Sequence, residues 1–425
     1  MIMKLLLLIV MRFLLLRFEL NIVIWNIFLP CRERDVNMKI MVLGAGMMGS
    51  AAVKDLIKSN IVSEVILASK FKKEIDNVAS KIGSEKLSTT IIDAMDPTAL
   101  SRLLRREDVD VVINALPHEI SLHVLRTEVN EEVNVVDLTF EDECMSLHQV
   151  AQEKDVIVVP GCGVAPGLSN MLVGYAAGKL EKARIVKIMV GGLPQKPKPP
   201  LEYRIVFNLE SVWQEYTEKV RIIRNGKVVE VEALSGLEEI YIPEIGELEC
   251  FYTDGLASLI FTYKEIEPLK NVEEMCEKTI RYPGHAQKIK TLIECGLLDT
   301  EPIEIKSVKI SPREFLTKLL TPKLQLREEK DFTIMKIKVV GEARGENVEY
   351  IYDLIDYYDE KEKVTSMART TAYTASIVAQ LIGQKKLKEK GLIPPEEIGL
   401  NQEAFQTVLN ELAKRNIKIK ETITV

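Results

Sequence analysis

The chain has 425 residues, of which 47% are hydrophobic and 28% are charged, and its formal net charge is −7. This length exceeds what a single hydrophobic core usually supports, so two domains are expected. The acidic balance excludes the basic surface of a nucleic-acid-binding protein. The six cysteines contain no C-x-x-C pair, so neither a metal site nor a disulfide framework is expected. A reducing cytoplasm is the location that fits best.

An apolar segment, residues 1–37, opens the chain. Its length could suit a membrane helix or a signal peptide. However, Arg12, Arg17 and Glu19 interrupt the run, and no small-residue cleavage site follows it. We interpret residues 1–37 as a hydrophobic extension that is not part of the fold, and we expect no membrane partner.

From Met38 onward, short β-branched runs alternate with amphipathic stretches at nearly regular spacing. This alternation predicts a doubly wound parallel sheet, and the continuous apolar strands indicate that helices cover both of its faces. The strands are expected at 39–44, 64–69, 88–93, 110–116, 134–138 and 155–160. The sequence therefore predicts an α/β fold in its first half.

The pattern changes after Val159, where a Gly/Pro loop, one helix and the proline-rich run QKPKPP follow. Period-two alternation in segments such as KVVEVEAL and FTIMKIKVVGEA predicts antiparallel strands that are wet on one face. We therefore expect a dinucleotide-binding domain at 38–165, an α+β, mostly antiparallel substrate and oligomerisation domain at 166–360, and C-terminal helices returning to the first domain at 361–425.

A glycine motif lies between the first expected strand and the first expected helix. Gly44, Gly46 and Gly49 form G-A-G-M-M-G, with Met47 and Met48 opening the helix. In this context the first glycine makes a tight turn, the second lets the backbone approach a pyrophosphate, and the third lets the helix pack on the strand. The motif indicates a Rossmann-type domain that binds NAD or NADP.

The end of the second strand informs the choice between these cofactors. An NAD-binding domain usually places an acid there for the ribose 2′-hydroxyl, but this chain has Ser69 and Lys70. A hydroxyl and an ammonium would accept a 2′-phosphate, which favours NADP, although NAD could bind without the acid. The remaining cofactor contacts are expected at the ends of the later strands: Asp93, Ala94, Asn114, Ala115, Leu116, Pro117 and Asp137.

Several longer motifs carry a resemblance to a known family. They include VLGAGMMG (42–49), VINALP (112–117), PGCGVAPGLSN (160–170), TIRYPGHAQKIK (279–290) and the helix SMARTTAYTAS (366–376). With these the chain resembles the L-lysine 6-dehydrogenases of the wider saccharopine dehydrogenase-like group. The resemblance implies oxidation of the lysine side-chain amine with NAD to the semialdehyde and ammonia, in a homo-oligomer. The chain departs from the group at Ser69, where many relatives carry Asp.

Oxidation at a carbon bearing nitrogen needs a neutral amine, and therefore a base. His285 is the first candidate, because it lies in a distinctive loop motif beside Arg281, and His118 is the second. The substrate carboxylate is expected on a guanidinium, from Arg281 or Arg369. Asp254 or Asp137 could hold amines, or could cap turns. Gly163 and Pro166 of the Gly/Pro loop are further candidates for substrate binding.

Two other functions remain open. A saccharopine- or carboxynorspermidine-type dehydrogenase would handle a bulky secondary amine and would need more arginines around the pocket. A dinucleotide-binding protein without turnover shares the same glycine motif, since a fold alone does not establish catalysis.

Overall fold

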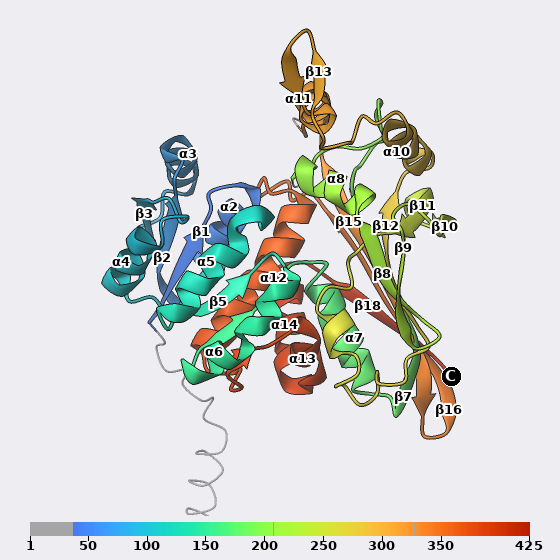
Figure 1. Cartoon of the computed structure of the whole chain (residues 1–425). Coiled ribbons are helices and arrows are strands. Elements are labelled where there is room, and N and C mark those ends of the chain that lie inside the picture. Colours follow the sequence, from blue (N-terminus) through green and yellow to red (C-terminus); the bar gives the residue numbers. More distant parts are fainter. Residues whose placement is uncertain (1–36, 207, 327–328) are drawn as a thin grey trace, which may run out of the picture. The chain divides into compact units, whose positions relative to one another are not determined.

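A computed structural model describes residues 37–206, 208–326 and 329–425. The expected extension at 1–37 therefore lies, except for Asn37, outside the described residues. From Met38 the chain forms one compact unit. It contains a parallel sheet flanked by helices and a second, mixed sheet, so the chain has the predicted α/β class (Figure 1).

The first sheet has seven strands in the order β17-β6-β5-β4-β1-β2-β3, and every neighbouring pair is parallel. The order reverses between β1 and β4, and ligands bind at such a switch point in open α/β sheets. The strands are β1 (Met38–Leu43), β2 (Val62–Ser69), β3 (Leu87–Ile91), β4 (Val111–Asn114), β5 (Asn134–Asp137), β6 (Ile157–Val159) and β17 (Gly391–Leu392).

Helices cover both faces of this sheet, as the apolar strands predict. Met41 and Leu43 pack in one cluster with leucines of α4, whereas Val42 on the opposite face approaches α2. α12 packs along α2 and also contacts β4 and β5. The helices are α2 (Met47–Leu56), α3 (Lys72–Ile82), α4 (Pro97–Glu107), α5 (His118–Asn130), the 3₁₀ helix η1 (Asp142–Leu147), α6 (His148–Glu153) and α12 (Ser366–Gly383).

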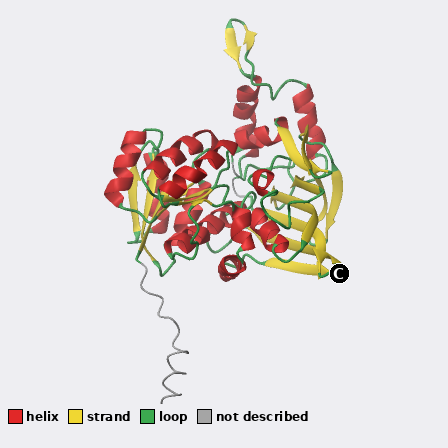
Figure 2. Cartoon of the chain, turned by 60° about the horizontal axis from the view of Figure 1, so that its bottom comes forward, coloured by secondary structure: helices red, strands yellow, loops and turns green. Residues whose placement is uncertain are grey.

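The second sheet has nine strands and is mostly antiparallel, but β7 and β12 pair in parallel. Its long strands β7, β15 and β16 pair side by side. Figure 2 shows strands of this sheet in yellow beside the C-terminus. The strands are β7 (Lys182–Pro194), β8 (Lys219–Arg224), β9 (Lys227–Glu232), β10 (Glu238–Ile242), β11 (Gly246–Tyr252), β12 (Glu274–Arg281), β15 (Asp331–Ala343), β16 (Glu346–Tyr357) and β18 (Ile419–Thr424).

The other helices lie beside these two sheets. A core of aromatic and aliphatic side chains, including Trp213, Tyr216 and Phe251, joins α8 and α10 to the second sheet. The helices are α7 (Leu168–Ala177), α8 (Leu209–Thr217), α9 (Leu259–Thr262), α10 (His285–Glu294), α11 (Pro312–Leu324), α13 (Pro395–Leu400) and α14 (Gln402–Lys414). A hairpin of β13 (Ile303–Ile305) and β14 (Val308–Ile310) projects beyond α11, with its strands mostly exposed.

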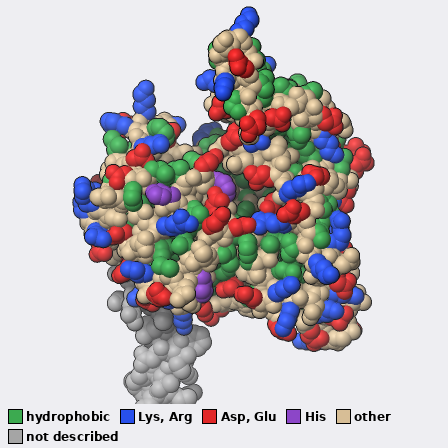
Figure 3. All heavy atoms as spheres, viewed as in Figure 1, with side chains coloured by type: hydrophobic (Ala, Val, Ile, Leu, Met, Phe, Trp, Pro, Cys, Tyr) green, Lys and Arg blue, Asp and Glu red, His purple; other side chains and the backbone are tan. Residues whose placement is uncertain are grey.

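The C-terminal segment contributes strands as well as the predicted helices. β17 extends the first sheet beside β6, and β18 pairs with β16 in the second. The face shown in Figure 3 mixes acidic and basic side chains. Within the described part of the chain, no helix combines the length and the apolarity needed to span a bilayer.

Candidate functional site

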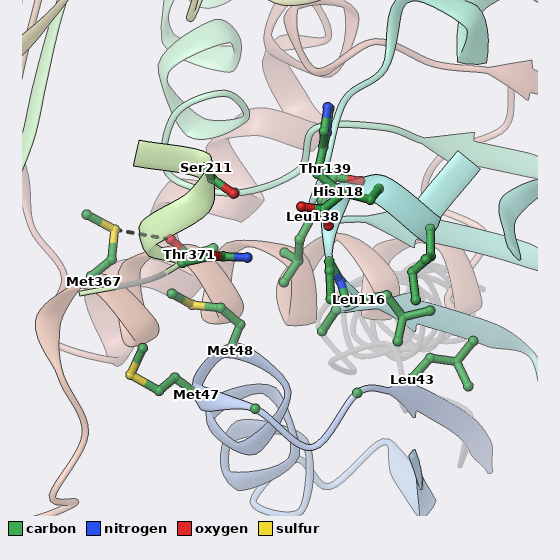
Figure 4. A pocket seen from close by; sticks show the side chains of 18 of the residues that line it. Leu43, Met47, Met48, Leu116, His118, Leu138, Thr139, Ser211, Met367 and Thr371 are labelled. Atoms are coloured by element: carbon green, nitrogen blue, oxygen red, sulfur yellow. Dashed lines mark hydrogen bonds between the residues drawn. The ribbon is translucent and has the colours of Figure 1, made fainter. Parts of the chain in front are cut away.

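A cavity of about 730 Å³ opens at the carboxyl ends of β1, β2 and β4 and continues to the second sheet. Figure 4 shows that side chains near the first sheet and near the second sheet face this cavity. Met47 and Met48 come from the start of α2, Leu116 and Thr139 come from loops of the first sheet, and Ser211 comes from α8. One cavity therefore joins the glycine motif to the second domain.

The structure gives a different reason for glycine at each of the three motif positions. At Gly44, φ is +105° and a Cβ would lie 2.4 Å from the Ala115 carbonyl oxygen. At Gly49, a Cβ would lie 1.9 Å from the Gly44 oxygen, so α2 can pack on β1 only without a side chain there. At Gly46, a Cβ would meet nothing within 4 Å. The open space at Gly46, in front of the free N–H groups of the α2 N-terminus, fits a pyrophosphate.

The end of β2 shapes one end of the cavity. Ser69, Lys70 and Asp93 all line it, as does Ala94. Glu74, in the first turn of α3, also lines this end and was not predicted. An ammonium and a carboxylate therefore both reach the region where the second strand of such domains meets the ribose.

A buried network holds two loops of the cavity wall. Asn114 donates to Ser121 Oγ at 2.9 Å and accepts from the Leu116 amide, which shapes the 115–117 loop. Asp137 Oδ2 accepts from Ser121 at 2.7 Å, and its Oδ1 accepts from the Thr139 amide at 2.8 Å. Burial raises the pKa of Asp137 to about 6. Asn114 and Asp137 thus support the wall, while Ala115, Leu116, Pro117 and Thr139 line it.

The Gly/Pro loop after β6 forms another part of the wall. Gly163 and Pro166 line the cavity, and the Gly163 amide donates to the Pro166 carbonyl at 2.9 Å. Beside Gly163, Thr371 and Met367 of α12 reach the cavity from the C-terminal segment, and Thr371 Oγ1 donates to Met367 Sδ (Figure 4).

Arg281, at the end of β12, lines the part of the cavity formed by the second sheet, although its side chain is only 3% exposed. Its Nε donates to Tyr216 Oη at 2.8 Å and its Nη1 donates to the Ile280 carbonyl at 2.9 Å. The guanidinium also lies over the Tyr203 ring, 5.0 Å from its centroid. Its third nitrogen, Nη2, faces Glu215, which also lines the cavity.

Glu215 lies beside this arginine, with 3.9 Å between Glu215 Oε2 and Arg281 Nη2. Its side chain is 35% exposed and lines the cavity, while protein atoms surround it on its other sides. Burial raises the pKa of Glu215 to about 7, against a smaller lowering by the Arg281 charge. A carboxyl group that titrates near neutrality can take and return protons at physiological pH.

His118 is a second titratable group on the wall. Its Nε2 lies 2.8 Å from Glu141 Oε1, and burial raises the pKa of Glu141. His118 follows β4 at the first position of α5 and therefore lies among residues of the first sheet. His118, the second candidate for the base, therefore lines the cavity.

Three other candidates do not line the cavity. His285 is 1% exposed, and both ring nitrogens have protein partners, Leu201 O at 2.8 Å and Tyr216 Oη at 3.0 Å. Asp254 is paired with Arg221 at 2.8 Å. Arg369 contacts Asp359 at 3.1 Å and the Arg415 carbonyl.

The burial of His285 opposes the base role expected for it. Desolvation and the Arg281 charge lower the pKa of His285 to about 3, so its imidazole is neutral and faces other side chains, not the cavity. A general base must come within hydrogen-bond reach of its substrate proton. His285 has no access to the cavity, whereas Glu215 and His118 both line it.

Sequence reasoning missed Glu215 and its neighbours on α8. Asn208, Ser211 and Glu215 are spaced three and four apart and all line the cavity, opposite the buried Val212 and Tyr216. Such spacing places them on one face of a helix. That signal was present in the sequence, but a polar helix face is usually solvated, and only the tertiary structure shows what it faces.

Two family models match the chain in succession. Residues 40–159 match the saccharopine dehydrogenase NADP binding domain, and residues 163–417 match the saccharopine dehydrogenase C-terminal domain. The second match alone spans more than half of the chain. It covers Arg281 and Glu215, while the first covers the glycine turn.

Known relatives agree with this assignment. Carboxyaminopropylagmatine dehydrogenase of Synechocystis sp. is 26% identical over 395 residues, which cover 88% of this chain and 96% of that protein. NADP-dependent, L-glutamate-forming saccharopine dehydrogenase of Saccharomyces cerevisiae is 24% identical, over 68% of this chain and 65% of that protein.

The solved structure of apo saccharopine dehydrogenase (L-Glu forming) from Saccharomyces cerevisiae shares the fold, with a TM-score of 0.75 and 19% identity, over 92% of this chain and 100% of that one. The matched domain and the open space at Gly46 agree on the cofactor, which is NAD(P). The chain therefore belongs to the saccharopine dehydrogenase family of NAD(P)-dependent oxidoreductases.

Proposed function

We propose that the chain oxidises the carbon–nitrogen bond of an amino acid that carries one carboxylate, with the side-chain amine of L-lysine as the first candidate. The observation that carries this proposal is the pairing of Glu215 with Arg281 inside the cavity that begins at the glycine turn. An acid that titrates near pH 7 and a fixed guanidinium suit an amine and a carboxylate on one small molecule.

Arg281 is proposed to bind the carboxylate. Its Nε and Nη1 already donate to protein oxygens, which orients the guanidinium and leaves Nη2 directed to the cavity. Guanidinium–carboxylate hydrogen bonds are charge-assisted and strong, and burial of Arg281 lowers competition from water.

Glu215 is proposed to handle the protons. Ionised Glu215 takes the proton from the substrate ammonium, which frees the nitrogen lone pair, and releases this proton to solvent. Ionised again, it takes a proton from the attacking water and passes it to the nitrogen, which leaves as ammonia and takes up the hydroxyl proton as the carbonyl forms. NAD(P), when bound, would supply the acceptor for the hydride of the carbon that bears the nitrogen. For L-lysine, one water is consumed, and the products are the semialdehyde, ammonium, reduced cofactor and one proton.

The lining favours a substrate with a single carboxylate. Among the described residues, Arg281 is the one arginine that lines this cavity, and its only lysine, Lys70, lies at the end of β2. A tricarboxylate such as saccharopine leaves further carboxylates without a guanidinium partner, and an unpaired charge is costly to desolvate.

A second candidate is a carboxylated secondary amine with a cationic tail. The relative that matches over 96% of its own length is named carboxyaminopropylagmatine dehydrogenase, and a 22% identical relative from Vibrio alginolyticus is named carboxynorspermidine synthase. Glu74 and Glu119 also line the cavity and could face a cationic tail.

For the cofactor, we propose NADP in preference to NAD. Ser69 and Lys70 line the cavity at the end of β2, where an NAD-binding domain usually has an acidic side chain that binds the ribose. They offer a hydroxyl and an ammonium to a 2′-phosphate instead.

One assay tests these choices together. The purified chain is incubated with NAD or NADP and with L-lysine, saccharopine or carboxyaminopropylagmatine, and reduced nicotinamide is followed by absorbance. Turnover of L-lysine supports the first candidate, and turnover of carboxyaminopropylagmatine alone supports the second. Turnover of saccharopine alone contradicts the single-carboxylate argument, and no reduction with any amine contradicts the proposed reaction.

A further inference from the structure

We propose that His285 and Tyr216 form a one-directional hydrogen-bond relay that positions Arg281 for the substrate carboxylate. His285 is then a positioning residue, which acts on the substrate only through two other side chains. The inference rests on the proposed carboxylate role of Arg281.

The relay starts at the Leu201 carbonyl. His285 Nδ1 lies 2.8 Å from this oxygen, and a carbonyl oxygen only accepts, so Nδ1 must carry the proton. The ring is neutral, because desolvation and the nearby Arg281 charge hold the pKa of His285 at about 3. A neutral imidazole has one proton, so Nε2 is an acceptor.

The direction of the next two bonds follows from that tautomer. Tyr216 Oη lies 3.0 Å from Nε2, so the tyrosine donates its single proton to the histidine. The tyrosine oxygen then has only lone pairs to offer, and Arg281 Nε donates to it at 2.8 Å. The chain of donors runs from Arg281 through Tyr216 and His285 to Leu201, and no bond in it can be reversed without leaving a partner unsatisfied.

The surrounding packing keeps this chain in one arrangement. The His285 ring lies 5.6 Å from the Tyr216 ring and 5.7 Å from the Tyr203 ring, centroid to centroid. Phe251 lies parallel to the imidazole, with 5° between the planes. All these side chains are at most 1% exposed, so water does not replace any member of the relay.

The consequence is a guanidinium whose orientation is set before the substrate arrives. Nε is held by Tyr216 and Nη1 by the Ile280 carbonyl, which directs Nη2 to the cavity and to Glu215. A preoriented group loses less conformational freedom on binding, so the relay should act on affinity for carboxylates more than on turnover.

The first test is the variant Tyr216→Phe, which keeps the ring and removes both relay bonds. Its KM for L-lysine should rise about 10- to 100-fold, the loss typical of a hydrogen bond to a charged group, with kcat nearly unchanged. With 1,5-diaminopentane, which lacks the carboxylate, kcat/KM should stay at the wild-type value. An equal loss for both amines would overturn the relay, because it would mean general damage to the site.

Two variants at position 285 provide a matched pair. His285→Gln can place a side-chain oxygen near the position of Nε2 and accept from Tyr216, whereas His285→Leu cannot. The KM for L-lysine should therefore be lower in His285→Gln than in His285→Leu. The reverse order would contradict the relay.

A measurement without substrate separates this inference from the proposed function. In ¹⁵N-histidine spectra, the signal lost in His285→Gln should show a protonated Nδ1 and an unprotonated Nε2 from pH 5 to pH 9. A protonated Nε2 would overturn the relay while leaving the function untouched. If Arg281→Met leaves the KM for L-lysine unchanged, the carboxylate site itself is wrong, whatever the spectra show.

Discussion

Replacing Glu215 by Gln gives the sharpest test of the proposed chemistry. The substitution keeps size and polarity but removes the carboxylate that α8 presents beside Arg281. A positioned general base typically contributes about 10²- to 10⁴-fold, so kcat/KM at pH 7 should fall by that order. Affinity for the dinucleotide should be unchanged, because Glu215 lies in the second domain.

The pH profile carries more information than the size of the loss. With a pKa of about 7 for Glu215, wild-type kcat/KM should fall about tenfold per pH unit below pH 6, as the base becomes protonated. Without the base, catalysis depends on amine that is already neutral. With an ordinary amine pKa of about 10.4, that fraction is about 4 × 10⁻⁴ at pH 7 and grows about tenfold per pH unit up to about pH 10. The variant should therefore recover steadily as the pH is raised toward 10.

Two control variants complete this experiment. Glu210→Gln makes the same change on the same helix, at a residue that pairs with Arg313 and does not line the cavity, and it should keep the wild-type profile. His118→Gln tests the other candidate for the base on the cavity wall. A Glu215→Gln enzyme whose kcat/KM falls less than about threefold, and still decreases below pH 6 as in the wild type, would refute the assignment. If that decrease at low pH disappears in His118→Gln instead, the base is His118.

Stability offers an independent readout of the same carboxyl group. Its folded pKa of about 7 lies above the ordinary value of 4.5, so ionisation disfavours the folded state. The contribution to stability is complete below about pH 4.5 and is lost as the pH rises through 7. In urea unfolding, Glu215→Gln should therefore gain stability relative to the wild type between pH 4.5 and pH 8. No relative gain over this range would contradict the raised pKa.

Further variants test the cofactor and substrate contacts. Gly46→Asp should abolish dinucleotide binding at near-normal melting temperature, since a side chain fits there without clash, whereas Gly49→Ala should lower the melting temperature by forcing a 1.9 Å contact apart. Wild-type affinity in Gly46→Asp would remove the pyrophosphate assignment. Ser69→Asp should lower the NADP/NAD ratio of kcat/KM, and an unchanged ratio would place the 2′-position elsewhere. Arg281→Met should raise the KM for L-lysine and move the acid limb to higher pH, because the positive charge that lowers the pKa of Glu215 is gone; a limb that stays in place would contradict their coupling.

The parallel sheet could be predicted because its signals are local. Each strand from β1 to β6 is a short run that contains apolar or β-branched residues and ends at a turn, and the glycine motif needs its strand–turn–helix context only from neighbouring residues. β17 could not be predicted in this way. It is two residues long and exists because Gly391 and Leu392 pair with β6, far earlier in the chain.

The residue proposed to handle protons could not be found from the sequence, because its place beside the cavity depends on tertiary contacts. The motif around His285 is distinctive in the sequence, but its histidine serves a buried hydrogen-bond network and does not reach the cavity. Glu215 carries no motif, and its raised pKa comes from the walls that fold around it. The expectation that Arg281 reaches the substrate cavity rested on the chemistry of carboxylates and agrees with where the structure places it.

The strand pairing of β17 with β6 has a consequence for synthesis on the ribosome. The nucleotide-binding sheet receives its edge strand and the cover provided by α12 from residues translated more than 200 positions after β6. Domains generally fold as units while the chain emerges, beginning with the N-terminal part. Here the N-terminal sheet is complete only after the last part of the chain has been translated. Until these residues are made, β6 has no β17 beside it and the surface of β4 and β5 that contacts α12 has no cover from that helix; unpaired strand edges and uncovered apolar surfaces favour association with other chains.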